Sequence, residues 1–447
     1  MKMKERNKRL IKLSFAGVLM CLILIIYYSV WNGYYNKIIE SPFWRRGNWM
    51  MVFLYGLLLL FFMKMYGGFK VGYLRKGNLI YSQILAVFFT NLFTYFQIVV
   101  LDKRFLSPFP LLLMTMVDAL VIITWTLIFQ KVYSWLFPPR KMLLVSGNRS
   151  DYHLMEKMNT REDKYEIRDT MNYRKGFETF KEKIQYCDGV IMGDMPSHER
   201  NQMLKYCFEK NIRTYSVPKI SDLLLRSSDE LTLFDSPLLL SRNDGLMIEQ
   251  LFIKRIIDII LSIIGLVVSS PLFIIVAIMI KLTDSGPVFY KQKRLTFGGK
   301  EFEIYKFRTM VQNAEKDTGP QLAKEHDERV LPVGYFLRRF RLDELPQLIN
   351  ILKGDMSLVG PRPERPELAS EIEKTIPEFS YRLKVKAGLT GYAQIYGKYN
   401  TTSYDKLKLD LTYIRNYSVW LDVKLMVMTP KIMMMRESSE GVTDKKD

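Results

Sequence analysis

Cysteine and histidine are scarce in this sequence of 447 residues. It contains three of each, and these are Cys21, Cys187, Cys207, His153, His198 and His326. Three cysteines in so long a chain exclude a scaffold held together by disulfides. Because the histidines lie far apart and have no paired cysteines near them, we expect no zinc site.

Acidic residues are outnumbered, with 46 Asp and Glu against 65 Lys and Arg, which gives a net charge of +19. Such a charge is typical of proteins that bind nucleic acid or anionic membranes. Residues 1–140 carry +13 and residues 251–310 carry +5, whereas residues 141–250 and 311–447 carry only −1 and +2. The two basic stretches also contain the long apolar runs. This distribution predicts a lipid bilayer as partner and no nucleic acid.

Four apolar runs lie within residues 1–138, namely Leu13–Val30, Trp49–Met63, Leu79–Leu101 and Leu111–Val132. A membrane-spanning helix needs about 20 apolar residues. Lys and Arg are more frequent before the first run and in the second loop than in the first and third loops, so the positive-inside rule predicts four spans with both ends in the cytoplasm. Asp118 lies inside the fourth run. It is either a functional intramembrane carboxylate or a helix-end residue that reaches the interface.

Residues 139–230 have a different pattern. Strand candidates at Lys141–Asn148, Tyr165–Arg168 and Gly189–Asp194 alternate with helical segments such as Arg200–Asn211. This alternation predicts βαβ units and a small parallel sheet. The turn after the first strand, Ser146–Ser150, has one glycine instead of a glycine-rich fingerprint. We therefore favour a structural or regulatory Rossmann-like module over a cofactor site, followed by a linker at 231–252.

A fifth apolar segment, Ile256–Ile280, is interrupted by Ser269-Ser270-Pro271. Proline inside a helix removes a hydrogen-bond donor and kinks or breaks the helix. Basic residues flank both ends of the segment, which favours a re-entrant helix–break–helix over 253–282 that enters and leaves the same leaflet. The alternative is an ordinary fifth span with a proline kink.

Cations surround an acidic pair in the last third of the chain. Lys306 and Arg308 alternate along a predicted strand and so share one of its faces. Because Pro346 suits the first turn of a helix, Asp343 is a candidate N-cap. There the helix end and nearby arginines should keep it ionised, as a nucleophile or metal ligand must be. Glu344 would point about 100° away and could take a separate role. The alternative is a cap beside a solvated acid.

A stiff turn follows at Pro361-Arg362-Pro363. The two prolines leave Arg362 little conformational freedom, which suits bidentate recognition of phosphate. A rigid exposed loop with a solvated arginine is the alternative. Several phosphate-suited cations around an acidic pair, just after a membrane-embedded segment, are more specific than any of these clusters alone.

Three motifs resemble those of the bacterial sugar transferases: Arg341–Asn350, Gly354–Pro363 and Lys386–Gly391. More narrowly, they resemble the large monotopic phosphoglycosyl transferases that initiate exopolysaccharide, capsule or O-antigen assembly. The resemblance covers about 190 residues at the carboxy end. It extends to a group that matches the re-entrant helix of that family, namely Lys254, Arg255, Asp258, Ser270 and Pro271. The implied fold is a membrane protein with four N-terminal transmembrane helices, an α/β Rossmann-like module and an α+β catalytic domain at 253–440.

The resemblance implies transfer of a sugar 1-phosphate, with glucose or galactose as the leading sugars, from a UDP-sugar to undecaprenyl phosphate, with release of UMP. Asp343 would be the nucleophile that forms an aspartyl–phosphosugar, and Glu344 would help to bind Mg²⁺. Expected phosphate or nucleotide contacts are Arg294, Lys306, Arg308, Arg341, Pro361, Arg362 and Pro363. The family also implies a bacterial plasma (inner) membrane location, a cytoplasmic catalytic domain and a homodimer.

Two other functions compete with this interpretation. One is a non-enzymatic membrane sensor or scaffold whose Rossmann-like module binds a nucleotide, and the other is a transporter with five spans. The intact acidic pair and the Pro-Arg-Pro turn favour the transferase. Near the end, Tyr413–Met435 mixes Trp and Met with Lys, which fits either an interfacial amphipathic helix or a buried core helix, and Pro430 interrupts both.

Overall fold

The computed structural model describes residues 7–147, 152–233, 235–241, 243–312, 314, 327, 329–397 and 401–433, with side chains omitted at 152, 153 and 157. Several predictions fall outside these residues: the end of the turn at 148–150, His326, the side chain of His153 and residues 434–440 of the catalytic domain. The chain forms two compact units, Met1–Lys219 and Ile220–Asp447. Each unit is described by itself.

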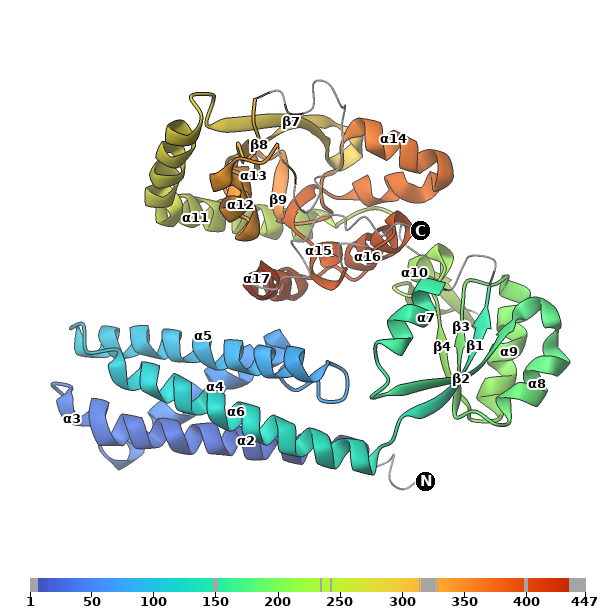
Figure 1. Cartoon of the computed structure of the whole chain (residues 1–447), viewed down its shortest axis with the longest axis horizontal. Coiled ribbons are helices and arrows are strands. Elements are labelled where there is room, and N and C mark those ends of the chain that lie inside the picture. The colour runs from blue at the N-terminus through green and yellow to red at the C-terminus, as the bar shows by residue number, and fades with distance from the viewer. Residues whose placement is uncertain are drawn as a thin grey trace. The chain divides into compact units, whose positions relative to one another are not determined.

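Long apolar helices begin the first unit. They are α2 (Lys8–Val30), which continues through the π-helical turn η1 (Trp31–Tyr35) into α3 (Asn36–Ile38), then α4 (Arg45–Tyr66), α5 (Lys76–Asp102) and α6 (Phe109–Leu136). The four predicted apolar runs lie within α2, α4, α5 and α6, which are long and apolar enough to cross a membrane. Figure 1 shows these four helices side by side as a bundle.

A buried polar chain crosses the interior of this bundle. The ring of Tyr27 stacks on Tyr55 with centroids 3.9 Å apart, and the Tyr55 hydroxyl donates to Asn91 at 2.8 Å. Asn91 in turn donates to Thr115 at 2.9 Å. Asp118 is completely buried on α6. The alternative that Asp118 reaches the membrane interface from a helix end is therefore wrong.

The rest of the first unit is a parallel sheet covered on both faces. The strands β1 (Arg140–Ser146), β2 (Tyr165–Asn172), β3 (Gly189–Met192) and β4 (Arg213–Ser216) pair in the order β2-β1-β3-β4. Helices α8 (Phe177–Ile184) and α9 (Ser197–Glu209) pack on one face, and α7 (Tyr152–Asn159) packs on the other. The predicted alternation of parallel strands and helices is confirmed.

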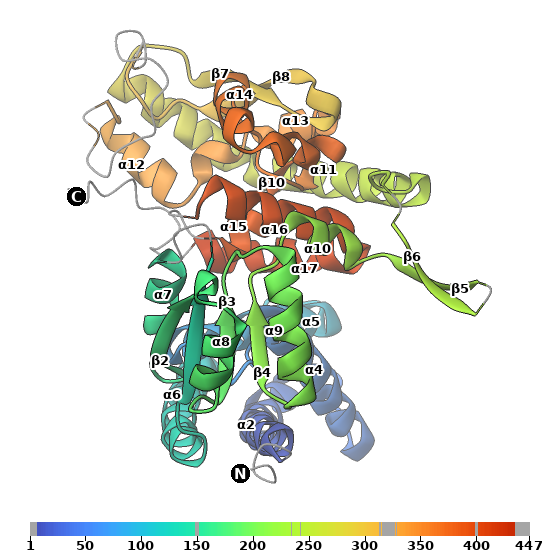
Figure 2. The same ribbon diagram turned by 90° about the vertical axis from the view of Figure 1, so that its right-hand side faces the viewer.

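The second unit opens with α10 (Ile220–Leu225) and a hairpin of β5 (Asp229–Leu233) and β6 (Ser236–Leu240), which projects from the unit in Figure 2. Although the predicted Rossmann-like module runs to residue 230, α10 packs into the core of the second unit through Ile220 and Leu223.

A mixed α/β body follows, as the sequence predicts. After α11 (Ile248–Thr283), the chain forms an antiparallel pair, β7 (Phe289–Leu295) and β8 (Glu301–Phe307), and a parallel pair, β9 (Met356–Val359) and β10 (Ala387–Thr390). The helices around these pairs are α12 (Pro332–Arg339), α13 (Gln347–Lys353), α14 (Pro366–Thr375), α15 (Tyr392–Tyr396), α16 (Ser403–Arg415) and α17 (Val419–Met433). Helix α17 buries Leu425 and Met428 in the core while Trp420 stays exposed, and it continues through Pro430.

Helix α11 is helical throughout its 36 residues, with Pro271 inside it, and Figure 1 shows two arms that meet at an angle. The predicted interruption is therefore a kink and not a loop. Proline at 271 cannot donate to the carbonyl of Val267. The Ser270 hydroxyl donates to that carbonyl at 2.8 Å, and the Ser269 hydroxyl donates to the carbonyl of Gly265 at 2.6 Å. The two serines thus satisfy backbone groups at the kink, which allows the helix to continue.

Candidate functional site

A tight backbone turn presents the acidic pair. Helix α12 ends at Arg339, and Arg341 adopts a left-handed conformation with φ = 52°. A short 3-10 helix, η4 (Leu342–Glu344), follows and carries both carboxylates. Helix α13 begins at Gln347 with Pro346 as its N-cap. The prediction that Asp343 caps this helix is therefore wrong, because the chain completes a separate 3-10 turn before α13 begins.

Glu344 is fixed by two cations from distant parts of the chain. Its Oε1 lies 3.1 Å from Lys306 Nζ of β8 and 3.0 Å from Arg362 Nη2 of the loop after β9. Burial raises the pKa of Glu344, but the charges of Lys306, Arg362 and Arg341 outweigh burial and hold this pKa well below its usual range. The Glu344 carboxylate therefore stays ionised.

Asp343, its neighbour, is in a different state. Its side chain is buried, and within the described part of the chain its carboxylate has no hydrogen bond or ion pair. Burial raises the pKa of Asp343, and the negative charge of Glu344 raises it further, while Lys306, Arg338 and Arg362 oppose this shift. The expectation that nearby arginines keep Asp343 fully ionised is therefore not met, because burial raises its pKa. The site combines one immobilised carboxylate with one that is free to react.

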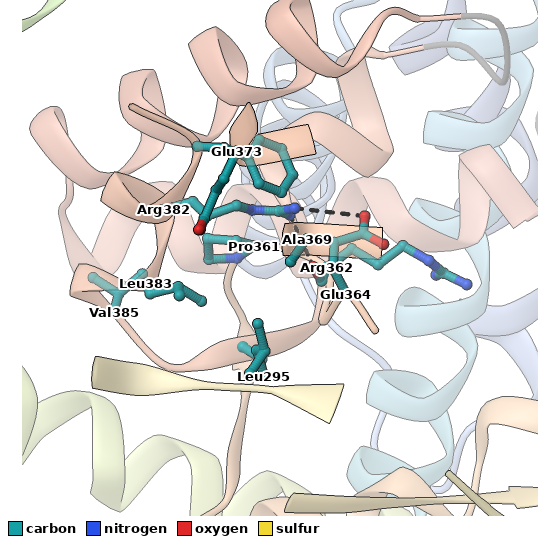
Figure 3. Close-up of a pocket in the computed structure, with 11 residues that line it drawn as sticks. Leu295, Pro361, Arg362, Glu364, Ala369, Glu373, Arg382, Leu383 and Val385 are labelled. Carbon is teal, nitrogen blue, oxygen red and sulfur yellow. Dashed lines mark hydrogen bonds and ion pairs between the residues drawn. The ribbon is translucent and has the colours of Figure 1, made fainter. Parts of the chain in front are cut away.

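The Pro-Arg-Pro turn is held in place through its backbone. Three groups bind the three carbonyls of residues 361–363 in order: the Gly388 N–H at 2.9 Å, the Arg382 guanidinium at 2.8 Å and the Arg294 guanidinium at 3.1 Å. Figure 3 shows Arg382 directed at Glu364, while the Arg362 side chain extends away from this cluster. The fixed backbone therefore aims the Arg362 guanidinium at Glu344.

The predicted phosphate-binding residues divide between two places. Small cavities of about 10 Å³ lie along the turn, and one of them is lined by Arg294, Lys306, Glu344 and Arg362. Arg308 lies elsewhere, because its Nη1 is 2.7 Å from the Asp284 carboxylate and its Nη2 is 3.2 Å from the Asp284 carbonyl. Strand β8 ends at residue 307, so the alternation that would place Arg308 beside Lys306 stops one residue too early.

The residues assigned to the re-entrant helix anchor α11 to the body of the second unit. Lys254 Nζ lies 2.6 Å from the Asp422 carboxylate and 3.2 Å from the Tyr413 hydroxyl, and all three side chains are buried. Burial raises the pKa of Asp422, while Lys254 opposes this effect. The first arm of α11 is thus joined to α17 by a buried ion pair and to α16 by a buried hydrogen bond.

Two further residues of α11 bind the elements that frame the acidic pair. Arg255 donates to the carbonyls of residues 351 and 352 in the last turn of α13, at 2.6 and 2.7 Å. Asp258 accepts from the Ser357 hydroxyl at 3.1 Å and from the Leu358 N–H at 2.9 Å, both in β9. Both of these described partners of Asp258 are uncharged groups, a hydroxyl and a backbone amide. Helix α11 therefore positions α13 and β9 directly.

Sequence reasoning missed Arg382, Asp284 and Asp422. Asp422 had a usable signal, because a carboxylate inside an apolar helical segment needs a partner once it is buried. Arg382 and Asp284 had none, since each acts on a residue that is 20 or 24 positions away in sequence.

The described residues around the acidic pair offer few side chains that could bind a metal ion. No group of three or more His, Cys, Asp or Glu side chains suited to a metal occurs among the described residues. Asp343 and Glu344 supply two carboxylates. Magnesium is commonly held by one or two carboxylates together with substrate phosphates, so this pair fits that mode of binding and does not fit an all-protein metal cage.

The fold and the site define a membrane-associated α/β protein with an acidic pair set among phosphate-suited cations. The chain belongs to the bacterial sugar transferase family, whose sequence model matches residues 249–436. A Bacillus subtilis (strain 168) protein named "Putative undecaprenyl-phosphate N-acetylgalactosaminyl 1-phosphate transferase" is 48% identical over 133 residues, which cover 30% of this chain and 74% of that protein.

Two longer relatives match about half of this chain. The UDP-N-acetylgalactosamine-undecaprenyl-phosphate N-acetylgalactosaminephosphotransferase of Aeromonas hydrophila is 38% identical over 242 residues, 52% of this chain and 54% of the relative. The undecaprenyl-phosphate galactose phosphotransferase of Salmonella typhimurium is 36% identical over 241 residues, 50% and 49% of the two chains. The match thus spans about half the length of these two curated relatives.

Proposed function

We propose that this protein transfers a sugar 1-phosphate from a UDP-sugar to undecaprenyl phosphate and releases UMP, as the first membrane step of exopolysaccharide, capsule or O-antigen synthesis. The observation that carries the proposal is the unpaired Asp343 carboxylate beside Glu344, which two cations immobilise. The names of the relatives support the same donor and acceptor class. The proposed sugar is a hexose, glucose or galactose.

The proposed reaction consists of two displacements at one phosphorus atom. An Asp343 carboxylate oxygen attacks the sugar-side phosphorus of the UDP-sugar, the bond from that phosphorus to the bridging oxygen breaks, and UMP leaves with the bridging oxygen. A phosphate oxygen of undecaprenyl phosphate then attacks the phosphorus of the aspartyl–phosphosugar, and the Asp343 carboxylate is released. Covalent catalysis of this kind divides one difficult step into two easier ones.

The other residues of the site would neutralise the negative charge of the substrate. Lys306 and Arg362 reach Glu344 from two sides, so a diphosphate bound there would meet two fixed cations, which is the main requirement of phosphoryl transfer. Glu344 would help to hold Mg²⁺ together with the diphosphate, and the ion would supply further charge neutralisation. The charge of Arg341 also acts on Glu344 and adds to the positive charge of the site.

We also propose that α11 is re-entrant and that the catalytic domain lies in the cytoplasm of a bacterial plasma (inner) membrane. A straight helix of 36 residues would be about 54 Å long, yet both arms of α11 pack on the same unit. The first arm uses Lys254, and the second uses Val276 and Ile280, which pack against Phe307 and Leu337. A homodimer stays a prediction.

Cysteine labelling tests this topology. In a background with Cys21 and Cys187 replaced by serine, Ser41→Cys in the first loop should react with an impermeant maleimide in intact cells, because the predicted loop lies outside. Ser380→Cys, exposed in η5 (Pro377–Lys384), should react only after permeabilisation. Reaction of Ser380→Cys from outside would support a fifth full span and the transporter alternative.

Substitution Arg382→Lys tests the positioning of the Pro-Arg-Pro turn. Lysine keeps the charge near Asp410, which lies 2.9 Å from Arg382, but it cannot reproduce the planar set of donors that also holds the Arg362 carbonyl. We expect UMP release to fall about 10-fold with little change in thermal stability. Arg415→Lys, an arginine of the same unit that donates to Ser227, is the matched control. An unchanged rate in Arg382→Lys would contradict the positioning role.

The pH dependence of turnover reports on Asp343. Because its pKa is raised, the neutral carboxyl forms at a higher pH than in an ordinary aspartate, and kcat/KM should fall as the pH drops through that value. Glu344→Gln removes a negative charge and leaves Lys306 and Arg362 unneutralised, so both effects lower the pKa of Asp343. We expect the acidic limb to move about one pH unit lower. If the acidic limb of the kcat/KM profile stays at the same pH in Glu344→Gln, this limb does not report the ionisation of Asp343.

A UMP-release assay over a panel of UDP-sugars tests the proposed function. Membranes that contain undecaprenyl phosphate should release UMP with UDP-glucose or UDP-galactose, and UDP-N-acetylgalactosamine belongs in the panel because two relatives carry its sugar in their names. Nucleotide binding without UMP release from any donor would instead support the sensor or scaffold function.

A further inference from the structure

The first unit contains a large cavity that the proposed reaction does not use. Its volume is about 520 Å³, within the range of small-molecule sites. It lies where the start of α2, the α4–α5 loop and the end of α6 meet the sheet. Seven Lys or Arg side chains line it, together with Asp163 as its one acidic lining residue.

Three of the four lysines that line this cavity face aromatic rings instead of carboxylates. Lys8 Nζ lies 4.6 Å from the ring centroid of Phe137, Lys12 Nζ lies 4.4 Å from that of Tyr73, and Lys164 Nζ lies 4.8 Å from the same Tyr73 centroid. Within the described ranges, none of these three lysines has an ion-pair partner. Cation–π contacts orient an ammonium group but do not neutralise it.

The carboxylate of Asp163 is already bound by an arginine outside the cavity lining. Arg161 binds it in a bidentate pair, with Nε and Nη2 at 2.8 and 3.1 Å from its two oxygens. The same arginine also donates to the carbonyl of Tyr73 in the α4–α5 loop, and Arg75 of that loop donates to the carbonyl of Thr160 at 3.1 Å. These bonds fix one wall of the cavity to the sheet module. The cavity is therefore preformed, and within the described residues no ion pair cancels the charges of Lys8, Lys12 and Lys164.

The cavity lies at the amino-terminal edge of the parallel sheet. Its lining includes Arg140, Tyr165 and Arg213, which are the first residues of β1, β2 and β4. Ligands of open α/β sheets usually bind at the opposite, carboxyl edge. At that edge Gly147 packs so tightly that a Cβ would come 2.0 Å from the Asp194 carbonyl oxygen. The cationic cavity is thus distinct from the customary nucleotide position of such a sheet.

We propose that this cavity binds a phosphate-bearing anion, with the phosphate among Lys8, Lys12 and Lys164 and the remainder of the ligand against the tyrosine rings. Phosphate is the anion that several unneutralised ammonium groups suit best at close range, and burial lowers the pKa of Lys164, which an anion would reverse. Because helix ends form one wall, an anionic lipid headgroup can supply the phosphate. A water-soluble phosphate compound is the other source.

The test uses the full-length chain in phosphatidylcholine nanodiscs with two additions in separate arms. One arm includes phosphatidylglycerol in the disc, and the other adds inorganic pyrophosphate to the buffer. We expect the unfolding temperature of the wild type to rise by about 2–4 °C in at least one arm, and the arm that responds identifies the source. Lys12→Gln/Lys164→Gln should lose this rise. Lys131→Gln, a lysine of α6 outside the cavity, should keep it.

The comparison with the glutamine variant also separates this cavity from the acidic pair, because pyrophosphate bound at the acidic pair would stabilise the wild type and the variant alike. Equal responses of the two proteins in both arms would therefore overturn the proposal. Lys12→Arg/Lys164→Arg keeps both charges and should keep the response. If the arginine variant loses the rise in unfolding temperature, packing and not charge produces that rise. This outcome would also overturn the proposal.

Discussion

Asp343→Asn is expected to reduce UMP release by about 10⁴-fold or more. Asparagine has nearly the shape of aspartate, so the buried position in η4 stays filled. Its amide cannot attack phosphorus, however, and no other described carboxylate of the cluster is free to replace it, because Glu344 is bound by Lys306 and Arg362. The steady-state rate of UMP formation, measured in undecaprenyl phosphate-containing membranes, gives the fold change.

A trapping experiment tests Asp343 as the nucleophile without relying on the rate of UMP formation. Without acceptor lipid, the wild-type chain incubated with its UDP-sugar should gain the mass of one phosphosugar, and Asp343→Asn should gain none. Glu367→Gln replaces an exposed carboxylate in the first turn of α14 and should behave as wild type in both assays. An adduct on another residue, or full turnover by Asp343→Asn, would refute the nucleophile while leaving the transferase proposal intact.

Lys254→Ala is expected to destabilise the second unit by about 3–5 kcal/mol. The Lys254–Asp422 pair joins α11 to α17, and each side chain of the pair is only 7% exposed. Removal of the ammonium leaves a buried carboxylate without its counter-ion, so Asp422 must either take up a proton or draw water into the core. Because burial already raises the pKa of Asp422, we expect the loss to be greater at neutral than at acidic pH.

Two further variants separate this ion pair from general damage. Lys254→Met/Asp422→Leu removes both charges and should recover most of the lost stability, since an apolar pair of similar volume replaces a buried ion pair at little cost. Lys291→Ala breaks a pair with Glu303 in which both side chains are more than half exposed, and it should cost less than about 1 kcal/mol. Denaturant unfolding in detergent measures all three. A Lys254→Ala variant as stable as Lys291→Ala would contradict the structural role.

Local patterns predicted the elements well where burial dictates the period. The apolar runs lie in α2, α4, α5 and α6, and the alternation of short strands with helices became a parallel sheet. Predictions that depended on where an element ends were less successful. Arg308 lies one residue beyond β8, and Asp343 lies before α13 in a separate 3-10 turn. Element ends depend on tertiary contacts, which a local pattern does not contain.

The candidate site was predicted as a set of residues but not as a geometry. Lys306 and Arg362 lie 38 and 18 positions from Glu344 in sequence, yet both cations meet on one oxygen of its carboxylate. The sequence did not predict that the two cations bind Glu344 and leave Asp343 without a partner among the described residues. This difference depends on which of two adjacent carboxylates faces those cations. The role of Arg382 behind the Pro-Arg-Pro turn was invisible for the same reason.

In the proposed re-entrant placement of α11, the contacts of Arg255 and Asp258 would connect the bilayer mechanically to the acidic pair. These residues belong to α11, and they bind the end of α13 and the strand β9 without an intervening loop. A change in the hydrophobic thickness of the membrane would tilt or shift α11, and the framework on either side of Asp343 would move with it. In that placement, acyl-chain length would be a variable that sets the alignment of the proposed reacting groups.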